Sequence, residues 1–158
     1  MRMTNTLFDI ESRRDWLAVL AHAPRHALAR FAKDLAGEGF ESLREPEIGL
    51  TMLRARVGNR GDRFNLGEAT VTRCVVRHCS ATGLVTAGVG YVLGRDLERA
   101  GWVARIDALL QQPEHHHTLM RDLVGPLRLA TQQVRKESAA RTAASRVQFY
   151  TLKTESMA

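Results

Sequence analysis

The sequence is poor in cysteine, and it has no long apolar segment. Cys74 and Cys79 are the only cysteines, and one pair without a second pair makes neither a zinc site nor a disulfide framework. We therefore expect reduced thiols that serve as small buried side chains in a cytoplasmic protein. No apolar run of 20 residues and no signal peptide is visible, so we expect no membrane segment.

Lysine is also scarce, and arginine carries almost all of the positive charge. The chain has 23 basic and 17 acidic side chains, and only Lys33, Lys136 and Lys153 are lysines. Arginine is well suited to bidentate contacts with phosphate and carboxylate groups. Because arginine-rich surfaces also occur without a ligand, the bias leaves open both an anion site and a solvated or partner-facing surface.

Length and composition are those of a folded globular protein. The apolar fraction of 44% and the charged fraction of 25% are ordinary for a soluble domain. A chain of 158 residues is long enough to bury one core. We therefore expect a single domain over residues 1–158.

The beginning of the chain predicts a helical hairpin. Ser12 and Asp15 resemble a capping box, and apolar residues come after them at helical spacing. Pro24 suits the first turn of a second helix, and Gly37 marks the expected end of that helix.

Three runs in the middle of the chain predict strands. LTMLRARV (50–57) alternates as a half-buried strand does, and ATVTRCVVRH (69–78) places Arg73 and Arg77 on one face. LVTAGVGYVLG (84–94) is rich in β-formers but interrupted by glycines. The short polar connections favour antiparallel pairing. We expect an α+β fold with an N-terminal helical hairpin, an antiparallel sheet of three or four strands, and C-terminal helices.

Helical spacing returns after the third run. Asp96 is the expected cap of the next helix, and Pro113 and the pair Gly125–Pro126 are expected to divide the C-terminal helical region. Residues 126–145 predict a long, partly exposed helix. Residues 147–152 (VQFYTL) have the composition of a strand that a partner or the chain's own sheet could complete.

The stretch from Gly58 to Arg73 is the first candidate for a site. Its glycines do not make a phosphate loop, because no Lys-Ser or Lys-Thr pair comes after them and the next element is a predicted strand. A looser anion site across adjacent strands remains open, as does a solvated or partner-facing surface. Its candidate residues are Arg56, Arg63, Arg73 and Arg77.

Neither a metal site nor a catalytic site is predicted from spacing. Residues 115–117 are three consecutive histidines, which point in different directions on a helix and cannot converge on one metal. We interpret them as an exposed polar turn. No pair of carboxylates and no Ser/His/Asp arrangement has a spacing that indicates catalysis.

Three ordered blocks are distributed over most of the chain: GDRFNLGEATVTRCVVR (61–77), GYVLGRDLERAGWVARIDALLQ (90–111) and SRVQFYTL (145–152). Together they resemble the PhnG family. RDWLAVLAHA (14–23) is similar to the opening helix of that family. PhnG is a subunit of the bacterial carbon-phosphorus lyase system, so the resemblance implies a role in the degradation of organophosphonates.

The resemblance also implies partners and a reaction. The family assembles with PhnH, PhnI and PhnJ subunits, and the complex joins a phosphonate to ribose C1 of ATP and expels adenine. The nucleosidase chemistry is assigned mainly to PhnI, and the later radical cleavage, with its iron-sulfur cluster and S-adenosylmethionine, to PhnJ. The resemblance thus implies an accessory subunit that binds no cofactor by itself and has ATP as the substrate of its complex.

The matching blocks supply the candidate site residues, whose roles the resemblance leaves open. We expect them to contact either a partner subunit or a shared anion, as we do for Arg56. They are Arg63, Phe64, Gly67, Glu68, Thr70, Thr72, Arg73, Arg77, Gly94, Arg95 and Asp96.

An independent basic module that binds nucleotides or nucleic acid is the alternative. The excess of arginine permits it. The scarcity of lysine and an aromatic fraction of 6% argue against it, as does the lack of a recognisable nucleic-acid-binding motif. Nucleic acid is therefore not an expected partner.

Overall fold

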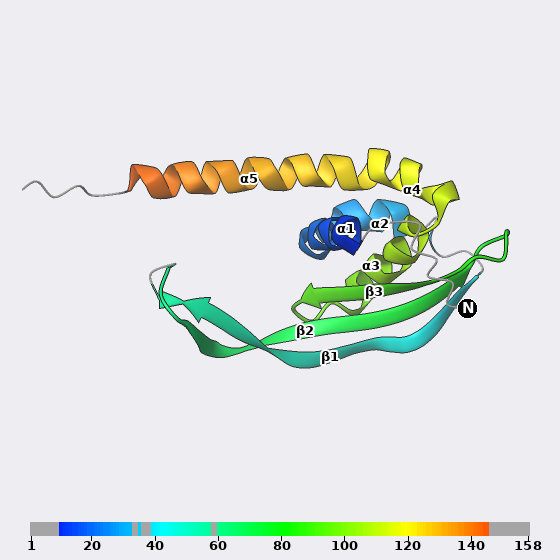
Figure 1. The fold of residues 1–158 in the computed structure, drawn as a ribbon, viewed down its shortest axis with the longest axis horizontal. Coiled ribbons are helices and arrows are strands. Elements are labelled where there is room, and N and C mark those ends of the chain that lie inside the picture. Colours follow the sequence, from blue (N-terminus) through cyan, green and yellow to red (C-terminus); the bar gives the residue numbers. More distant parts are fainter. Residues whose placement is uncertain (1–9, 33–34, 36–38, 58–59, 146–158) are drawn as a thin grey trace, which may run out of the picture.

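The computed structural model describes residues 10–32, 35, 39–57 and 60–145. Two helices precede a three-stranded antiparallel sheet, and further helices come after it (Figure 1), which confirms the expected α+β fold. The elements are α1 (Ile10–His22), α2 (Arg25–Ala32), β1 (Phe40–Arg56), β2 (Arg63–Cys79), β3 (Val85–Leu93), α3 (Leu97–Leu110), α4 (Pro113–Leu119), the π-helical segment η3 (Met120–Val124) and α5 (Gly125–Ala144).

The first two strands form a hairpin that extends beyond the third strand. β1 and β2 each have 17 residues and pair along their whole length, whereas β3 pairs only with residues 71–79 of β2. We call the projecting part, residues 50–57 and 60–70, the hairpin arm. None of residues 50–57 or 63–70 is fully buried. The expectation of a half-buried strand over 50–57 was therefore wrong, because no third layer among the described residues covers either face of the arm.

Helix α3 packs closely against one face of the sheet and covers it. The alternating residues 72, 74, 76 and 78 of β2 are buried on this inner face. On β3, a Cβ atom added to Gly88 or Gly90 would lie 1.9 Å from a backbone carbonyl oxygen of α3. The glycines that interrupt the predicted strand are thus the positions where helix and sheet touch.

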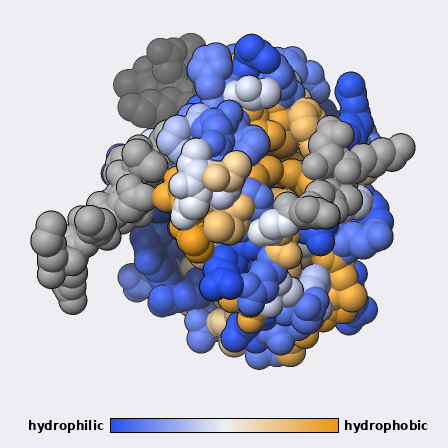
Figure 2. All heavy atoms as spheres, turned by 90° about the vertical axis from the view of Figure 1, so that its right-hand side faces the viewer, coloured by the Kyte–Doolittle hydropathy of each residue, from blue (hydrophilic) through white to orange (hydrophobic). Residues whose placement is uncertain are grey.

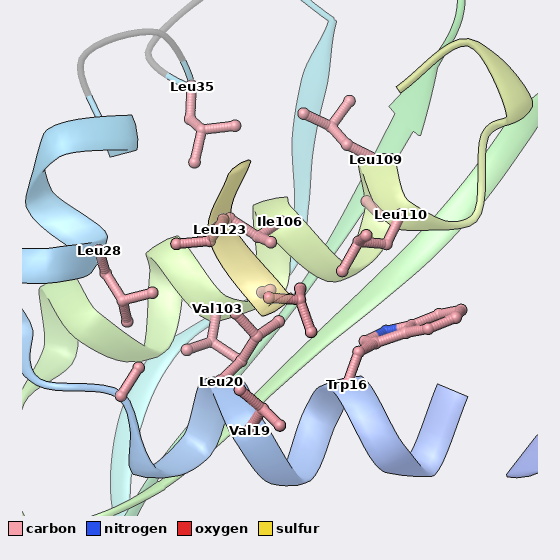
Figure 3. Close-up of a cluster of buried hydrophobic side chains, with 14 of the residues drawn as sticks. Trp16, Val19, Leu20, Leu28, Leu35, Val103, Ile106, Leu109, Leu110 and Leu123 are labelled. Carbon is pink, nitrogen blue, oxygen red and sulfur yellow. The ribbon is translucent and has the colours of Figure 1, made fainter. Parts of the chain in front are cut away.

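The core lies between α3 and the other helices. α1, α2, α3 and η3 direct large apolar side chains toward one another (Figure 3). These side chains include Trp16, Leu20, Leu28, Val103, Ile106, Leu110 and Leu123. Cys74 is buried against this core as expected, but Cys79 is exposed. The prediction for Cys79 was wrong because odd-numbered positions at this end of β2 point to the outer face of the sheet.

The predicted helical hairpin is confirmed, although its start differs. α1 already includes Ser12, so Ser12 and Asp15 form no capping box. The carbonyl oxygen of Pro24 accepts hydrogen bonds from the backbone N–H groups of Ala27 and Leu28, which begins α2. The end expected at Gly37 lies outside the described residues.

Gly125 and Pro126 do not divide the C-terminal helices. Pro113 begins α4 as expected, but the chain continues through η3 into α5 without leaving the helical conformation. The N–H of Gly125 donates to the carbonyl of Met120, five residues earlier, and this π turn makes room for the proline ring. The histidines at 115–117 lie in α4, not in a turn.

α5 confirms the long exposed helix that was predicted. Every residue from Gln132 to Ser145 is exposed, and α5 projects to the same side as the hairpin arm (Figure 1). The opposite end of the molecule is mostly polar, with smaller apolar patches between the polar side chains (Figure 2). No helix among the described residues is long and apolar enough to span a bilayer. The strand expected at 147–152 lies outside the described residues.

Candidate functional site

The structure places the predicted site residues in three separate regions. One group lies on the hairpin arm, one on the outer face of the sheet, and one where β3 turns into α3. The arm carries Arg56, Arg63, Phe64, Gly67 and Glu68, and the outer face carries Arg73 and Arg77. The turn carries Gly94, Arg95 and Asp96, and it is hydrogen-bonded to Thr70 at the base of the arm and to Thr72 of β2.

The two arginines of the outer face pair with glutamates of the neighbouring strand. Arg73 lies opposite Glu47 and its Nε donates to that carboxylate over 2.5 Å. Arg77 lies opposite Glu41 and forms the same kind of ion pair. The hydrogen bond from Arg73 to Glu47 raises the pKa of the guanidinium above its already high ordinary value. Both arginines therefore have carboxylate partners within the chain.

The two arginines of the arm have a different environment. Arg56 and Arg63 are directly opposite each other in the β1–β2 register, and Arg56 Nη1 donates to the carbonyl oxygen of Gly61 over 3.2 Å. Ten residues of extended strand separate Arg63 from Arg73, which corresponds to about 33 Å. The four arginines proposed as one anion site are therefore divided into two distant pairs.

A β-bulge at Gly67 determines which side chains share a face of the arm. Leu53 pairs with Gly67, but the next residue of β1 pairs with Asn65, so Leu66 is an extra residue in β2. Gly67 has a φ of +153°, a conformation that side-chain-bearing residues rarely adopt. Because of the bulge, Phe64 lies on the opposite face from Glu68.

The turn between β3 and α3 joins two of the family blocks. The N–H of Gly94 donates to the carbonyl of Thr70 over 2.9 Å, and the hydroxyl of the buried Thr72 donates to the carbonyl of Gly94 over 2.7 Å. Gly94 has a φ of +99° and ends the strand. These contacts give Thr70, Thr72 and Gly94 a structural role.

Asp96 caps α3, as the sequence predicted. Its carboxylate accepts a 3.0 Å hydrogen bond from the N–H of Arg99 and a 2.6 Å bond from Arg25 on α2. Partial burial opposes ionisation, but these two donors hold the pKa of Asp96 below its usual value. Arg25 also stacks over Trp102, 5.1 Å from the ring centroid. Asp96 therefore links α2 to α3, and its neighbour Arg95 is exposed.

A hollow of about 380 Å³ lies where the base of the arm meets the helices. Arg99 closes one side by donating to the carbonyl of Ala21 over 2.5 Å. Apolar side chains with one arginine and one histidine form a surface of the kind found in binding sites. Sequence reasoning missed this hollow because its residues come from five elements without a common motif. They are Ala21, His22, Thr51, Val71, Tyr91, Leu93 and Arg99.

In the part of the chain that the structure describes, no three metal-binding side chains come together.

The fold and its surface define a small α+β protein that projects a β-hairpin and a helix from its core. A family model described as phosphonate metabolism protein PhnG matches residues 11–154, and the chain belongs to the PhnG family.

A relative from Rhizobium meliloti (strain 1021) agrees with this assignment. That protein is named alpha-D-ribose 1-methylphosphonate 5-triphosphate synthase subunit PhnG, and it is 40% identical to this chain over 147 residues. The alignment covers 90% of this chain and 89% of the relative. The family resemblance of the sequence blocks is thereby confirmed.

Proposed function

We propose that this chain is the PhnG subunit of an alpha-D-ribose 1-methylphosphonate 5-triphosphate synthase in organophosphonate catabolism. The observation that carries the proposal is the 40% identity to the R. meliloti subunit over 90% of this chain. Coverage of nearly the whole of both proteins supports the transfer of a subunit role, because no large part of either chain is left unmatched.

The proposed partners are PhnH-, PhnI- and PhnJ-like subunits, and the proposed compartment is the cytoplasm. In the reaction, an oxygen of the phosphonate forms a bond to ribose C1 of ATP, the bond from C1 to the adenine nitrogen breaks, and adenine leaves with a proton. We propose an accessory role for this chain. The structural roles found for Thr72, Gly94 and Asp96 support that view, since they explain part of the family motif without chemistry.

Co-expression with the three partner subunits tests the proposal. The full complex is expected to join methylphosphonate to ribose C1 of ATP, and a preparation that lacks only this chain is expected to lose that transfer, as measured by formation of the phosphonate product. Adding the purified chain back should restore the transfer. Full activity without the chain, or a chain that never copurifies with the other subunits, would reject the proposed role.

The alternative of an independent nucleic-acid or nucleotide module has no support from the family comparisons. The ion pairs of Arg73 and Arg77 also remove two of its candidate phosphate contacts. A steep salt dependence of DNA binding by the isolated chain would revive it, because each neutralised phosphate releases counterions.

A further inference from the structure

The hairpin arm lacks the packing that normally stabilises a β-ribbon. Among the described residues its strands pair only with each other, apart from the N–H of Gly94 that donates to Thr70 at the base of the arm, since β3 begins its pairing with β2 at Val71. Two-stranded ribbons are marginally stable in water unless a helix or further strands cover one face. Both faces of this arm are accessible along residues 50–57 and 63–70.

Large apolar side chains occupy both faces of the arm. Leu50 and Met52 share one face by register, and Leu53 lies on the other, which Phe64 joins because of the bulge at Gly67. Leu50 is 65% exposed and Leu66, within the bulge, 62%. Exposed apolar surface of this kind is found at sites of protein contact. Because both faces are apolar, the arm fits a groove with two walls better than a flat surface.

The charge of the arm is concentrated at its tip. Arg54, Arg56, Arg60 and Arg63 lie within ten positions and none takes part in an ion pair among the described residues. Asp62 is the acid between them.

The cross-strand partners of the arginines differ between the tip and the base of the hairpin. At the base, Arg73 and Arg77 face glutamates, whereas at the tip Arg56 faces Arg63. Directly opposed like charges destabilise a hairpin. The tip therefore has a positive charge that a negative surface would compensate.

We propose that the hairpin arm inserts into a groove on another protein subunit, with apolar walls and carboxylates at the end that receives the tip. This inference rests on the proposed function as a complex subunit, and it names the surface and the chemistry of the contact. A protein groove fits better than nucleic acid because the arm exposes aliphatic side chains and a single aromatic ring, that of Phe64.

Charge reversal at the tip tests the electrostatic part of the proposal. Arg56→Glu combined with Arg63→Glu is expected to weaken assembly with the partner subunits at least about tenfold, because like charges would then meet in the groove. Arg14→Glu with Arg30→Glu makes the same charge change on exposed positions of α1 and α2. This control should assemble within about twofold of the unmodified chain.

Polar substitution tests the apolar part. Leu50→Ser with Met52→Ser is expected to weaken assembly to a similar extent, whereas Leu43→Ser with Val85→Ser, exposed side chains at the opposite end of the sheet, should not. Circular dichroism and the thermal midpoint of each isolated variant separate lost contacts from lost folding. If the double variant Leu50→Ser with Met52→Ser unfolds, the single variant Leu50→Ser replaces it.

Photocrosslinking identifies the surface that receives the arm. Benzoylphenylalanine in place of Phe64 is expected to crosslink to one partner subunit, at a peptide that contains acidic and apolar residues. Crosslinks to a second copy of this chain, to nucleic acid or to a basic peptide would overturn the inference.

The inference also fails if the unmodified chain assembles and the arm variants assemble equally well. That outcome would leave the proposed function standing. Failure of the unmodified chain to copurify would reject both.

Discussion

The indole nitrogen of Trp16 donates a 2.8 Å hydrogen bond to the carboxylate of Asp107, which ties α1 to α3. The same carboxylate accepts bonds of 2.7 Å from Arg13 Nη2 and 2.9 Å from the backbone N–H of Val89, on the free edge of β3. Asp107 is fully buried, so these donors take the place of water around its charge. One carboxylate thus connects two helices and the sheet.

Asp107→Ala is expected to lower the free energy of unfolding by about 3–5 kcal/mol, because it leaves buried donors and a partly buried arginine without their acceptor. The shift of the urea midpoint at pH 7 measures this effect. Asp122→Ala breaks the exposed ion pair with Arg121 and should leave the midpoint unchanged. Equal midpoints for the two variants would show that Asp107 is not a structural centre.

We expect protonation of His78 to make the fold less stable at acidic pH. Its ring is buried next to Phe40, and burial, together with repulsion from His115, lowers the pKa of His78 below its ordinary value near 6.5. Gln112 and Glu114 oppose this shift without reversing it. Because the unfolded chain takes up the proton at higher pH than the folded chain, stability is complete above about pH 6.5 and falls as the pH decreases toward the folded pKa.

Urea midpoints measured between pH 5 and pH 8 test the role of His78. His78→Gln is expected to flatten the decrease below pH 6.5, whereas replacement of the exposed His117 by Gln should not. An unchanged slope in His78→Gln would assign the decrease to other groups.

Gly88→Ala is expected to destabilise the fold by about 1–3 kcal/mol or more, because the new methyl group would overlap the backbone of α3. Gly49→Ala is the matched control, since a Cβ atom there has no neighbour within 4 Å. Thermal midpoints of the two variants measure the difference. A Gly88→Ala protein as stable as Gly49→Ala would mean that α3 does not approach the sheet this closely.

Arg73→Ala and Glu47→Ala are expected to have similarly small effects on assembly and on phosphonate transfer by the complex. Both changes break the exposed cross-strand ion pair, and Glu47→Ala also removes the exposed 3.4 Å contact with Arg44, which contributes little. If Arg73 instead orients ATP or phosphonate, Arg73→Ala alone would lower turnover while leaving assembly intact. Measuring both variants in the purified complex therefore separates an intrachain role from a substrate role.

Local patterns predicted much of the sheet and the helices. The alternation in residues 69–78 placed Cys74 and His78 on the face opposite Arg73 and Arg77, which the structure shows to be the buried face. Asp96 marked the start of α3. These features depend on neighbouring residues alone, namely the two-residue period of a strand and the donors of the first helical turn.

Features that depend on distant partners could not be predicted. The run at 50–57 alternates as a half-buried strand would, and only the length of β3 shows that no other described strand extends alongside it. In the same way, no pattern distinguishes Asp107 from an exposed acid of α3, because its donors come from α1 and β3. The two pairs of arginines also became distinguishable only through their cross-strand register.

The π turn at Met120–Val124 also sets the rotational phase of the last helix. One additional residue in a helical turn rotates every later side chain by about 100° relative to an uninterrupted α-helix. With this offset Leu127 is buried, and residues 132–145 are exposed to solvent. Pro113 thus determines where the helical run begins, and the extra residue determines which side of α5 an approaching protein meets.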